Sequence, residues 1–358
     1  MASLSTPSGD PAAKPLRTAI LGYGVAGRFF HGTFLGSNPA YEVAVISTAD
    51  PDRAVQARED HPGALVIADP RTVVDHAGDL DLVVVCTPPS SHVELARVAM
   101  RAGLDVVVDK PFAPSSKEGT ELIAEASQAG RRLSVFQNRR YDADFLTLRS
   151  LLEEGTLGAV HTFESRFEWW KPTGERSWKA STPVKDGGGI LFDLGPHLID
   201  QALQLFGPVS ELQAHVRSVG NELGPDNTAH LCLTHANGTI SRLIMSSLSA
   251  LEGPRFHVSG TEGAWRTYGK DPQEAALRSG AGPGTPGFGQ ESEAERGELS
   301  IDGQFDPTPA GTGDYGRYYR ELADALNTGA PVPVEPQDAV DALRLIEAAH
   351  RAPHTNLR

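Results

Sequence analysis

The glycine-rich segment Gly22-Tyr23-Gly24-Val25-Ala26-Gly27 constrains the fold of this chain more than any other feature of its sequence. It follows an apolar strand candidate, Leu16–Leu21, and precedes a predicted helix, which is the context that a dinucleotide-binding loop requires. Gly22 permits the tight turn, Gly24 lets a pyrophosphate approach the backbone, and Gly27 lets the helix pack closely on the strand. The pyrophosphate would lie at the helix N-terminus, where free N–H groups and the helix dipole favour an anion.

Strand and helix candidates alternate through the first part of the chain, which favours a doubly wound parallel sheet. The segment Leu80–Cys86 is nearly continuous in Leu and Val, as is typical of a parallel strand covered on both faces. We therefore expect an α/β protein in which residues 15–138 form an N-terminal Rossmann dinucleotide-binding domain. Its predicted strands are Leu16–Leu21, Val43–Ser47, Leu80–Cys86, Asp105–Val108 and Leu133–Gln137, and its predicted helices include Ser91–Ala102 and Ser115–Gln128.

The pattern changes after Arg139, where a helix candidate is followed by a series of strand candidates. Asn237-Gly238, between two of these strands, is a strong hairpin pattern. We expect residues 139–358 to form a C-terminal substrate and oligomerisation domain, an α/β domain with a large, open, mostly antiparallel sheet. Helices would cover one face, and the uncovered face leads us to expect a homodimer or homotetramer. The predicted strands are Ala159–Trp169, Val209–Val219, Thr228–His235, Gly238–Ser247 and Arg255–Gly260, and the predicted helices are Asp142–Glu154, Tyr315–Asn327 and Gln337–His350.

The segment Ser279–Gly313 is rich in Gly, Pro and acidic residues. We expect a long surface excursion with little regular structure of its own. Loops of this length are uncommon without a function or disorder. Two interpretations stay open: the segment reaches over the active site or a neighbouring subunit, or it is a loop without a role.

Composition limits the partners of the chain. The formal net charge is −14 over 358 residues, which disfavours nucleic acids and anionic membranes because both repel an acidic protein. No apolar run approaches the roughly 20 residues of a membrane span. Residues 1–14 lack the basic start and apolar core of a secretory signal, so we expect a disordered tail on a cytoplasmic protein. Cys86 and Cys232 fit buried, reduced thiols, and no metal-ligand spacing involves them, so no metal site is predicted.

The residues after the second predicted strand bear on the choice of cofactor. Dinucleotide-binding folds recognise the adenosine ribose there, and an acidic residue favours NAD because its carboxylate accepts from the 2′-hydroxyl. Ser47 and Thr48 occupy this place, and Arg53 lies one turn further on. Hydroxyls and a guanidinium suit a 2′-phosphate, so we expect NADP. NAD stays possible, since Asp50 could serve as the ribose ligand.

A second cofactor-binding stretch follows the third predicted strand. Thr87 and Pro88 lie at the carboxyl edge of the predicted sheet, where cofactors bind in such folds. We assign both residues to the cofactor site. His92, at the start of the next helix, either caps that helix or touches the cofactor.

Two short motifs, far apart in the chain, supply groups that can handle protons. Asp109-Lys110-Pro111 follows the strand Asp105–Val108, which places Lys110 at the carboxyl edge of the sheet. Asp193 and His197 follow the glycine run Gly187–Gly189 and are four residues apart, so they fall within about one helical turn. A regular helix is expected to start or break between them, because Gly195 and Pro196 intervene.

These groups fit a dehydrogenase, which takes a proton from an alcohol while a hydride leaves for a nicotinamide. We assign the proton to His197, oriented by Asp193, because a neighbouring carboxylate fixes the imidazole tautomer and raises its basicity. Lys110 would hydrogen-bond the same oxygen and stabilise the developing alkoxide charge. The roles of Lys110 and His197 can also be exchanged, and the sequence does not separate the two assignments.

The two motifs resemble those of the Gfo/Idh/MocA oxidoreductases, and the resemblance runs from about Leu16 to the C-terminal helices. The family's Glu-Lys-Pro is present as Asp109-Lys110-Pro111. Its Gly-Gly…Asp-x-Gly-x-His is present as Gly188-Gly189…Asp193-Leu194-Gly195-Pro196-His197. The resemblance implies that Lys110, Asp193 and His197 are the catalytic set, with Asp109 and Lys110 also at the cofactor. It implies a Rossmann domain followed by an open-sheet α/β domain.

Other stretches are similar to the NADP-dependent scyllo-inositol dehydrogenase branch of that family. They are Val135-Phe136-Gln137-Asn138-Arg139-Arg140-Tyr141-Asp142-Ala143-Asp144-Phe145-Leu146-Thr147, the residues from Asp193 to Gln201, and Gly253-Pro254-Arg255-Phe256. This similarity implies NADP as cofactor, a polyol, inositol or sugar as substrate, and Asn138 near the nicotinamide or substrate.

Trp169, Lys171 and Trp178 lie between the first C-terminal strand and the catalytic turn. We assign them to substrate binding, together with Lys110, Asp193 and His197. Aromatic faces pack on the C–H surfaces of sugars, and a lysine can donate to hydroxyls. The alternative is that the tryptophans are core or oligomer contacts.

Two alternative functions use the same fold. A sugar 1-dehydrogenase or a dihydrodiol dehydrogenase of the same family would use the same three catalytic residues. A nucleotide-sensing regulator would need the glycine loop but not the proton-handling groups. The presence of Lys110, Asp193 and His197 therefore favours an enzyme.

Overall fold

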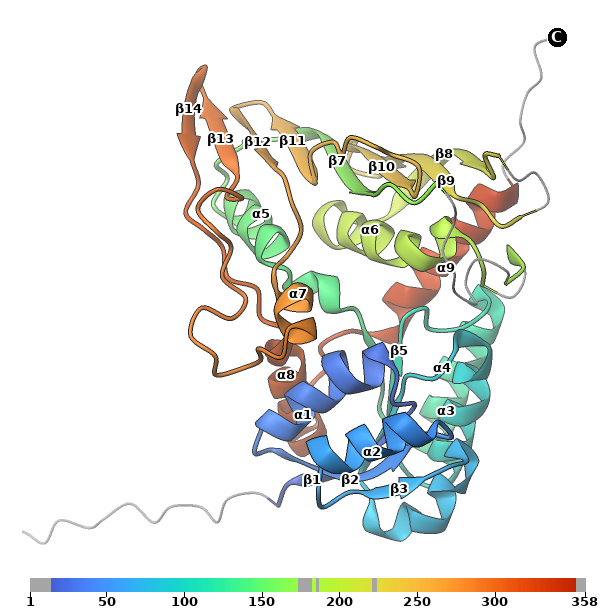
Figure 1. Cartoon of the computed structure of the whole chain (residues 1–358). Helices are drawn as coiled ribbons and strands as arrows, with labels where there is room; N and C mark the ends of the chain where they lie inside the picture. Colours follow the sequence, from blue (N-terminus) through green and yellow to red (C-terminus); the bar gives the residue numbers. More distant parts are fainter. Residues whose placement is uncertain (1–13, 173–181, 185–186, 221–223, 352–358) are drawn as a thin grey trace, which may run out of the picture.

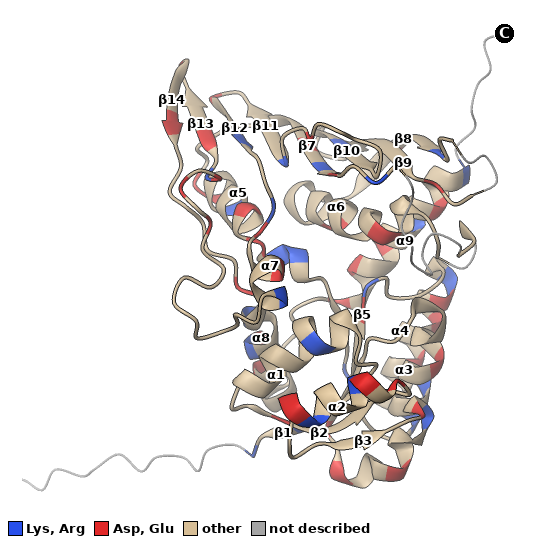
Figure 2. Cartoon of the chain, viewed as in Figure 1, with Lys and Arg blue, Asp and Glu red and all other residues tan. Residues whose placement is uncertain are grey.

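The described part of the chain contains two sheets, one above the other in Figure 1, each covered by helices. The structure is a computed structural model and describes residues 14–172, 182–184, 187–220 and 224–351. The predicted N-terminal tail lies almost entirely outside these residues. Within them, no helix is long and apolar enough to cross a membrane. Basic and acidic residues both occur on the helices of each half (Figure 2).

The first sheet is entirely parallel and has the order β3-β2-β1-β4-β5-β6, which confirms the predicted Rossmann-type domain. Its strands are β1 Leu16–Leu21, β2 Tyr41–Ser47, β3 Leu65–Ile67, β4 Leu82–Val85, β5 Asp105–Asp109 and β6 Leu133–Phe136. The chain runs outward from β1 to β3 and then crosses to β4. The strand order therefore reverses between β1 and β4, and ligands bind beside such a switch point at the carboxyl ends of the strands.

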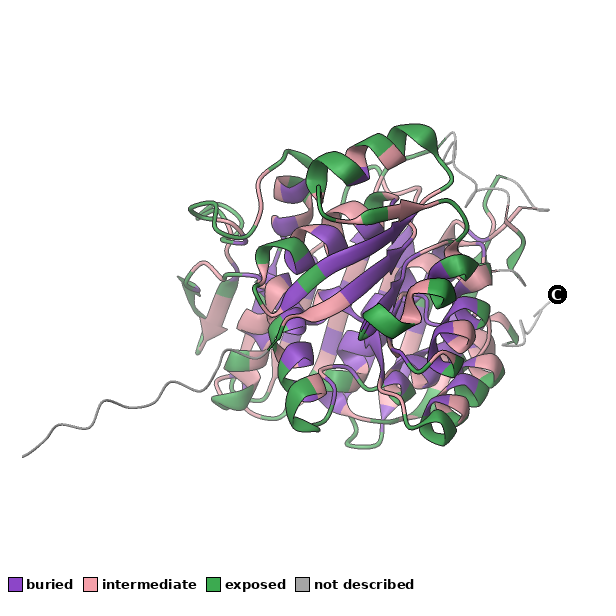
Figure 3. Ribbon diagram, turned by 90° about the horizontal axis from the view of Figure 1, so that it is seen from below, coloured by how far each residue is buried: buried purple, intermediate pink, exposed green. Residues whose placement is uncertain are grey.

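Helices cover both faces of this sheet, and Figure 3 shows its buried strands between them. Val83, Val84 and Val85 of β4 have no exposed surface, as the apolar run predicts. The helical segments are η1 Ala26–Gly32, α1 Thr33–Ser37, α2 Pro51–Asp60, η2 Pro70–Asp79, η3 Pro89–Ser91, α3 His92–Arg101, α4 Ser116–Ala129 and η4 Asn138–Tyr141.

The second sheet has the order β14-β13-β12-β11-β7-β10-β9-β8, and only β7 and β10 pair in parallel. The prediction of an open, mostly antiparallel sheet is confirmed. Its strands are β7 Val160–Glu168, β8 Val209–Arg217, β9 Thr228–His235, β10 Ile240–Ser246, β11 Phe256–Gly260, β12 Gly263–Thr267, β13 Glu298–Ile301 and β14 Gln304–Pro307. Its helices are α5 Ala143–Glu153, α6 Ile190–Phe206, α7 Gln273–Arg278, α8 Tyr315–Thr328 and α9 Pro336–Arg351.

Side chains of this sheet alternate between a helix-covered face and an open face. Phe163, Leu231, Leu243 and Val258 are buried under the helices, and α5, α6 and α9 all lie on that side in Figure 1. The hairpin predicted at Asn237-Gly238 joins β9 to β10, with Gly238 at a φ of 89°. An αL-type turn of this kind favours glycine, which explains the Asn-Gly pair.

The prediction for Ser279–Gly313 is wrong in part. This segment contains the hairpin β13–β14, which extends the second sheet at one edge. The two strands were hard to recognise because each has only four residues and neither is buried, and β13 is held in the sheet by its pairing with β12. The sequence analysis also missed β3, β12, α2 and α7.

Helices α8 and α9 connect the two halves. Tyr318 of α8 donates to Ser134 of β6 at 3.0 Å, and Ser134 donates to the carbonyl of Val334 at 2.9 Å. All three residues are buried. The C-terminal segment is therefore part of the core of the first half, and α9 also packs on α6 and β8 of the second half.

Candidate active site

A cavity of about 910 Å³ lies between the two halves, at the carboxyl edge of the first sheet. The glycine-rich loop and the ends of β2, β4 and β5 line one side, and β7, α6 and α7 line the other. It is therefore where the topology predicts a ligand site.

The glycine loop forms a cradle whose shape depends on its glycines. A Cβ on Gly22 would lie 2.9 Å from the carbonyl oxygen of Cys86, and one on Gly27 would lie 2.0 Å from that of Gly22. A Cβ on Gly24 would meet nothing nearer than an Arg53 nitrogen at 3.7 Å. Gly22 and Gly27 are thus required for close packing, whereas Gly24 leaves the backbone open toward the cavity.

Five residues of the loop line the cavity, namely Gly22, Tyr23, Gly24, Val25 and Ala26. The helix η1 begins at Ala26, so its first N–H groups lie at the cavity wall. Such a helix start binds anions. The cradle fits the pyrophosphate of a dinucleotide.

The predicted ribose-binding residues lie together in the same cavity. Ser47, Thr48 and Arg53 all line it, as does Asp50. One carboxylate oxygen of Asp50 accepts the backbone N–H groups of Asp52 and Arg53, each at 3.0 Å, and so caps helix α2. Its other oxygen lies 3.7 Å from Nε of Arg53. Asp50 thus caps α2 with one oxygen, while its side chain is 45% exposed.

Thr87 and Pro88 line the cavity, but His92 does not. His92 is buried, with Nδ1 2.9 Å from the carbonyl oxygen of Pro111 and Nε2 2.8 Å from that of Thr87. The predicted contact of His92 with the cofactor is therefore wrong. Its imidazole instead contacts the segments that contain Thr87 and Pro111, behind the cavity wall. Burial lowers the pKa of His92.

Lys110 and Asp193 come together from different elements. Lys110 follows the end of β5, and its Nζ donates to Oδ1 of Asp193 and to the backbone carbonyl of the same residue, both at 3.0 Å. The side chains are 20% and 27% exposed, so this ion pair is partly shielded from water. Asp109 and Lys110 both line the cavity, with Asn138 beside them.

Asp193 and His197 lie one turn apart on the continuous helix α6. The helix begins at Ile190 and continues through Pro196, so it is not broken between the two residues. We predicted Asp193 as the orienting partner of His197, whereas its carboxylate accepts from Lys110 in the structure. Asp193 thus brings Lys110 next to the His197 turn.

His197 is only 5% exposed and lines the cavity. Burial, followed by the positive charges of Lys110 and Arg139, lowers its pKa well below the ordinary value of 6.5. Its Nδ1 is buried and has no hydrogen-bond partner. The imidazole is therefore neutral at pH 7 and can accept a proton.

Asp226 accepts hydrogen bonds from the N-terminus of α6, a role that the sequence analysis missed. Its carboxylate accepts from the N–H of Leu191 at 2.8 Å, and its carbonyl accepts from that of Ile190 at 2.8 Å. A Cβ on Gly189 would lie 2.1 Å from the Asp226 carboxylate. The glycine run thus lets Asp226 approach the helix that carries Asp193 and His197.

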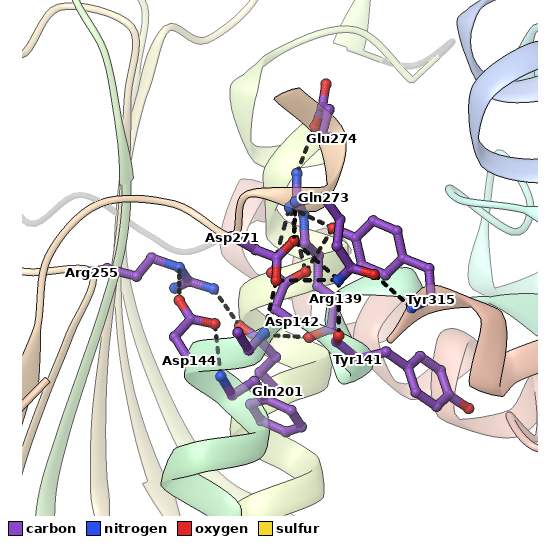
Figure 4. A network of polar contacts seen from close by, with 12 residues as sticks. Arg139, Tyr141, Asp142, Asp144, Gln201, Arg255, Asp271, Gln273, Glu274 and Tyr315 are labelled. Carbon is purple, nitrogen blue, oxygen red and sulfur yellow. Dashed lines mark hydrogen bonds and ion pairs between the residues drawn. The ribbon is translucent and has the colours of Figure 1, made fainter. Parts of the chain in front are cut away.

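A buried polar network, drawn in Figure 4, fixes another wall of the cavity. Arg139 donates to Oε2 of Glu274 at 2.9 Å and to the hydroxyl of Tyr315 at 3.0 Å, and it pairs with Asp142. Arg139 and Glu274 both line the cavity, with Arg278 next to them. The sequence analysis did not assign Glu274 and Arg278 to the site, because both lie on the short helix α7, far along the chain from the motifs.

The predicted substrate-binding residues divide into three groups. Lys110, Asp193, His197 and Trp169 line the cavity. Lys171 is exposed and does not line it, although its Nζ lies 5.3 Å from the ring centre of Trp169. Trp178 lies outside the described residues.

A dinucleotide cradle that opens onto a lysine, a carboxylate and a neutral histidine defines a nicotinamide-dependent oxidoreductase. Among the residues that the structure describes, no three His, Cys, Asp or Glu side chains gather as a metal site. The site thus offers proton-handling groups beside a place for a cofactor.

Comparison with known proteins agrees with this class. Residues 16–137 match the family model of an oxidoreductase family with an NAD-binding Rossmann fold, and residues 149–356 match the model of its C-terminal alpha/beta domain. The chain belongs to this family, the Gfo/Idh/MocA oxidoreductases, and is a dehydrogenase acting on CH–OH groups.

Relatives resemble the chain over nearly its whole length. The oxidoreductase YdgJ of Escherichia coli is 35% identical, covering 94% of this chain and 97% of its own length. The NADP-dependent scyllo-inositol 2-dehydrogenase IolW of Bacillus subtilis is 32% identical, covering 93% and 92%. The solved structure of the oxidoreductase yvaA of Bacillus subtilis has a TM-score of 0.89 at 32% identity, covering 96% and 97%.

Proposed function

We propose that this protein is an NADP-dependent dehydrogenase that oxidises a secondary alcohol of a cyclitol or sugar, as a scyllo-inositol dehydrogenase does. The observation that carries the proposal is one cavity lined by the glycine cradle, the Lys110–Asp193 ion pair and a neutral His197. These are the groups that an alcohol oxidation needs around one carbon atom.

In this proposal the catalytic residues are Lys110, Asp193 and His197. Lys110 donates a hydrogen bond to the substrate oxygen and stabilises its growing negative charge. His197 accepts the hydroxyl proton, because its imidazole is neutral and faces the cavity. Asp193 holds the lysine ammonium at 3.0 Å. An oxidised nicotinamide bound in the cradle supplies the hydride acceptor.

The cofactor-binding set in this proposal is the glycine loop, the ribose-binding residues and the carboxyl ends of β4 and β5. These residues line the cavity, except Gly27, which packs behind it: Gly22, Tyr23, Gly24, Val25, Ala26, Gly27, Ser47, Thr48, Arg53, Thr87, Pro88, Asp109, Lys110 and Asn138.

The lining of the cavity beyond Lys110 supports a polyhydroxylated substrate. Phe167 and Trp169 offer aromatic faces, and Lys270 and Glu274 offer a donor and an acceptor for hydroxyl groups. Aromatic rings with a few polar groups suit the C–H faces and hydroxyls of a cyclitol or sugar. The similarity to IolW supports the same class.

The preference for NADP rests on the groups at the ribose end of the cavity. Ser47 and Thr48 offer hydroxyls there, and Arg53 offers a guanidinium. Asp50, the rival ligand for an unphosphorylated ribose, already caps α2. A 2′-phosphate would gain a charge-assisted hydrogen bond from Arg53.

Initial rates of cofactor reduction test this function. We expect NADP⁺ to be preferred over NAD⁺ when scyllo- and myo-inositol, aldoses and dihydrodiols are tried as substrates. Arg53→Ala should lower kcat/KM for NADP⁺ about 10- to 100-fold, the loss of one charge-assisted hydrogen bond, with little effect on NAD⁺. Arg58→Ala is the matched control, since Arg58 lies on the same helix and does not line the cavity.

A preference for NAD⁺, together with an Arg53→Ala protein whose kcat/KM is unchanged for both cofactors, would contradict the assignment of NADP. Turnover of aldoses at C1, or of dihydrodiols, without turnover of any inositol would replace the cyclitol assignment.

We also propose that the open face of the second sheet is an oligomer interface. On β10, buried residues alternate with residues that face the open side, and the latter include the exposed Ile240 and Arg242.

Residues 15–138 and 139–358 are the two domains in this proposal.

A further inference from the structure

A completely buried histidine, His31, lies between the cofactor loop and the strand end that carries Lys110. It belongs to η1, the π-helix that follows the glycine loop, and has no exposed surface. Nδ1 of its ring is 2.5 Å from the hydroxyl of Tyr319 on α8. Nε2 is 3.9 Å from Oδ2 of Asp109, the last residue of β5. One side chain of η1 therefore faces two other elements, α8 and β5.

Nε2 of His31 is buried and has no hydrogen-bond partner. Buried polar atoms without a partner are uncommon, so each needs a physical explanation. The nearest charged group in that direction is the carboxylate of Asp109. In the tautomer in which the Tyr319 hydroxyl donates to Nδ1, the ring N–H lies on Nε2 and faces Asp109.

Asp109 is tied directly to the backbone of Lys110. Its Oδ1 accepts the backbone N–H of Lys110 at 2.8 Å, which leaves Oδ2 for His31. Burial acts to raise the pKa of Asp109, but His31, Lys110 and His92 outweigh it and lower that pKa. The ionised carboxylate thus joins the catalytic turn on one oxygen to His31 on the other.

The surroundings of His31 hold the ring in one place. The ring of Phe136 lies 4.6 Å from it, centre to centre, and the ring of Tyr319 lies 6.3 Å away, edge on. The widened turn of a π-helix is frequently found at functional sites. His31 therefore has a fixed orientation toward Asp109.

We propose that His31 is a positioning residue for Lys110, acting through Asp109. Its Nε2 faces Asp109 Oδ2 across 3.9 Å, and the attraction between the two groups orients the Asp109–Lys110 turn toward Asp193. Because His31 lies on the helix that starts at the pyrophosphate cradle, a small shift of η1 on cofactor binding would close the 3.9 Å separation. The inference rests on the proposed role of Lys110.

Two isosteric substitutions separate this role from simple packing. In His31→Gln the amide nitrogen stands near the place of Nε2 and keeps the donor to Asp109. In His31→Asn it stands near the place of Nδ1 and keeps only the contact with Tyr319. Both variants lose the aromatic packing on Phe136, so their thermal stabilities should be similar.

We expect His31→Asn to lower kcat at least about tenfold, with KM for the cofactor changed less than about threefold, because a small misplacement of a catalytic group lowers turnover strongly. His31→Gln should keep at least about tenfold more kcat than His31→Asn. Tyr319→Phe, the mildest change, should lower kcat severalfold because it frees the ring to change tautomer.

Equal kcat values for the Gln and Asn variants, or an unchanged kcat in Tyr319→Phe, would overturn the role of His31. Lys110→Ala is assayed in parallel. If Lys110→Ala is inactive while the two His31 variants are equal, only the inference about His31 fails. If Lys110→Ala keeps full turnover, the proposed function of the site fails as well.

Discussion

Replacing Lys110 with alanine is expected to lower kcat by about 10²- to 10³-fold while the affinity for the cofactor changes only a few fold. The reason is that, in the proposed mechanism, Lys110 is the donor that β5 and Asp193 hold at the reacting oxygen, and loss of one such donor costs this much. The cradle that we propose for the pyrophosphate is formed by the glycine loop, which does not include Lys110. The substitution should therefore lower kcat without a comparable loss of cofactor affinity, which fluorescence titration measures.

Lys117→Ala is the matched control, because this lysine is exposed on α4 and pairs only with Glu121 among the described residues. It should leave both quantities unchanged. A Lys110→Ala protein with wild-type turnover would instead place the chemistry on other groups. A protein without any turnover whose response to nucleotide survives the substitution would be a regulator.

The second large effect is expected at His197, through its state of protonation. Since burial and neighbouring cations lower its pKa well below 6.5, the imidazole is unprotonated and able to act as a base throughout neutral pH. The value of kcat/KM for alcohol oxidation should therefore stay level as the pH falls through 6.5. It should decline only at lower pH, where His197 takes up a proton.

His197→Asn should lower kcat by about 10²- to 10⁴-fold, the usual contribution of a general base, and should remove the acidic limb of the pH profile. The pH dependence of kcat/KM in the wild type and the variant provides the measurement. A retained acidic limb in the variant would assign that ionisation to another group. If Lys110 rather than His197 is the base, the acidic limb of the kcat/KM profile should disappear in Lys110→Ala instead of in His197→Asn.

Local patterns predicted most of the cofactor half, apart from β3 and α2, because the predicted elements have short-range causes. In the glycine loop between Leu16–Leu21 and η1, Gly22 and Gly27 make close contacts that a Cβ would block. The Val-rich strands were predicted to be buried from their apolar composition, and in the structure helices cover both of their faces. Lys110 and Asp193 were both recognised from their motifs, although their contact is visible only in the fold.

Several site residues could not be predicted because their roles arise from tertiary contacts. His92 stands in the sequence where a cofactor ligand could be, yet it turns inward to two carbonyl groups. Asp226 and Glu274 lie in stretches without any motif, and they reach the site only because α6 and α7 pack there. The edge hairpin β13–β14 consists of two short strands, and it joins the sheet through the pairing of β13 with β12.

A crystal structure with the oxidised cofactor and an inositol bound would test the central claim most directly. We expect the pyrophosphate on the glycine loop and one ring hydroxyl within hydrogen-bond distance of both Lys110 Nζ and His197. The 2′-phosphate should face Arg53. A substrate bound away from Lys110 and His197, with its carbinol carbon remote from the nicotinamide, would contradict the account.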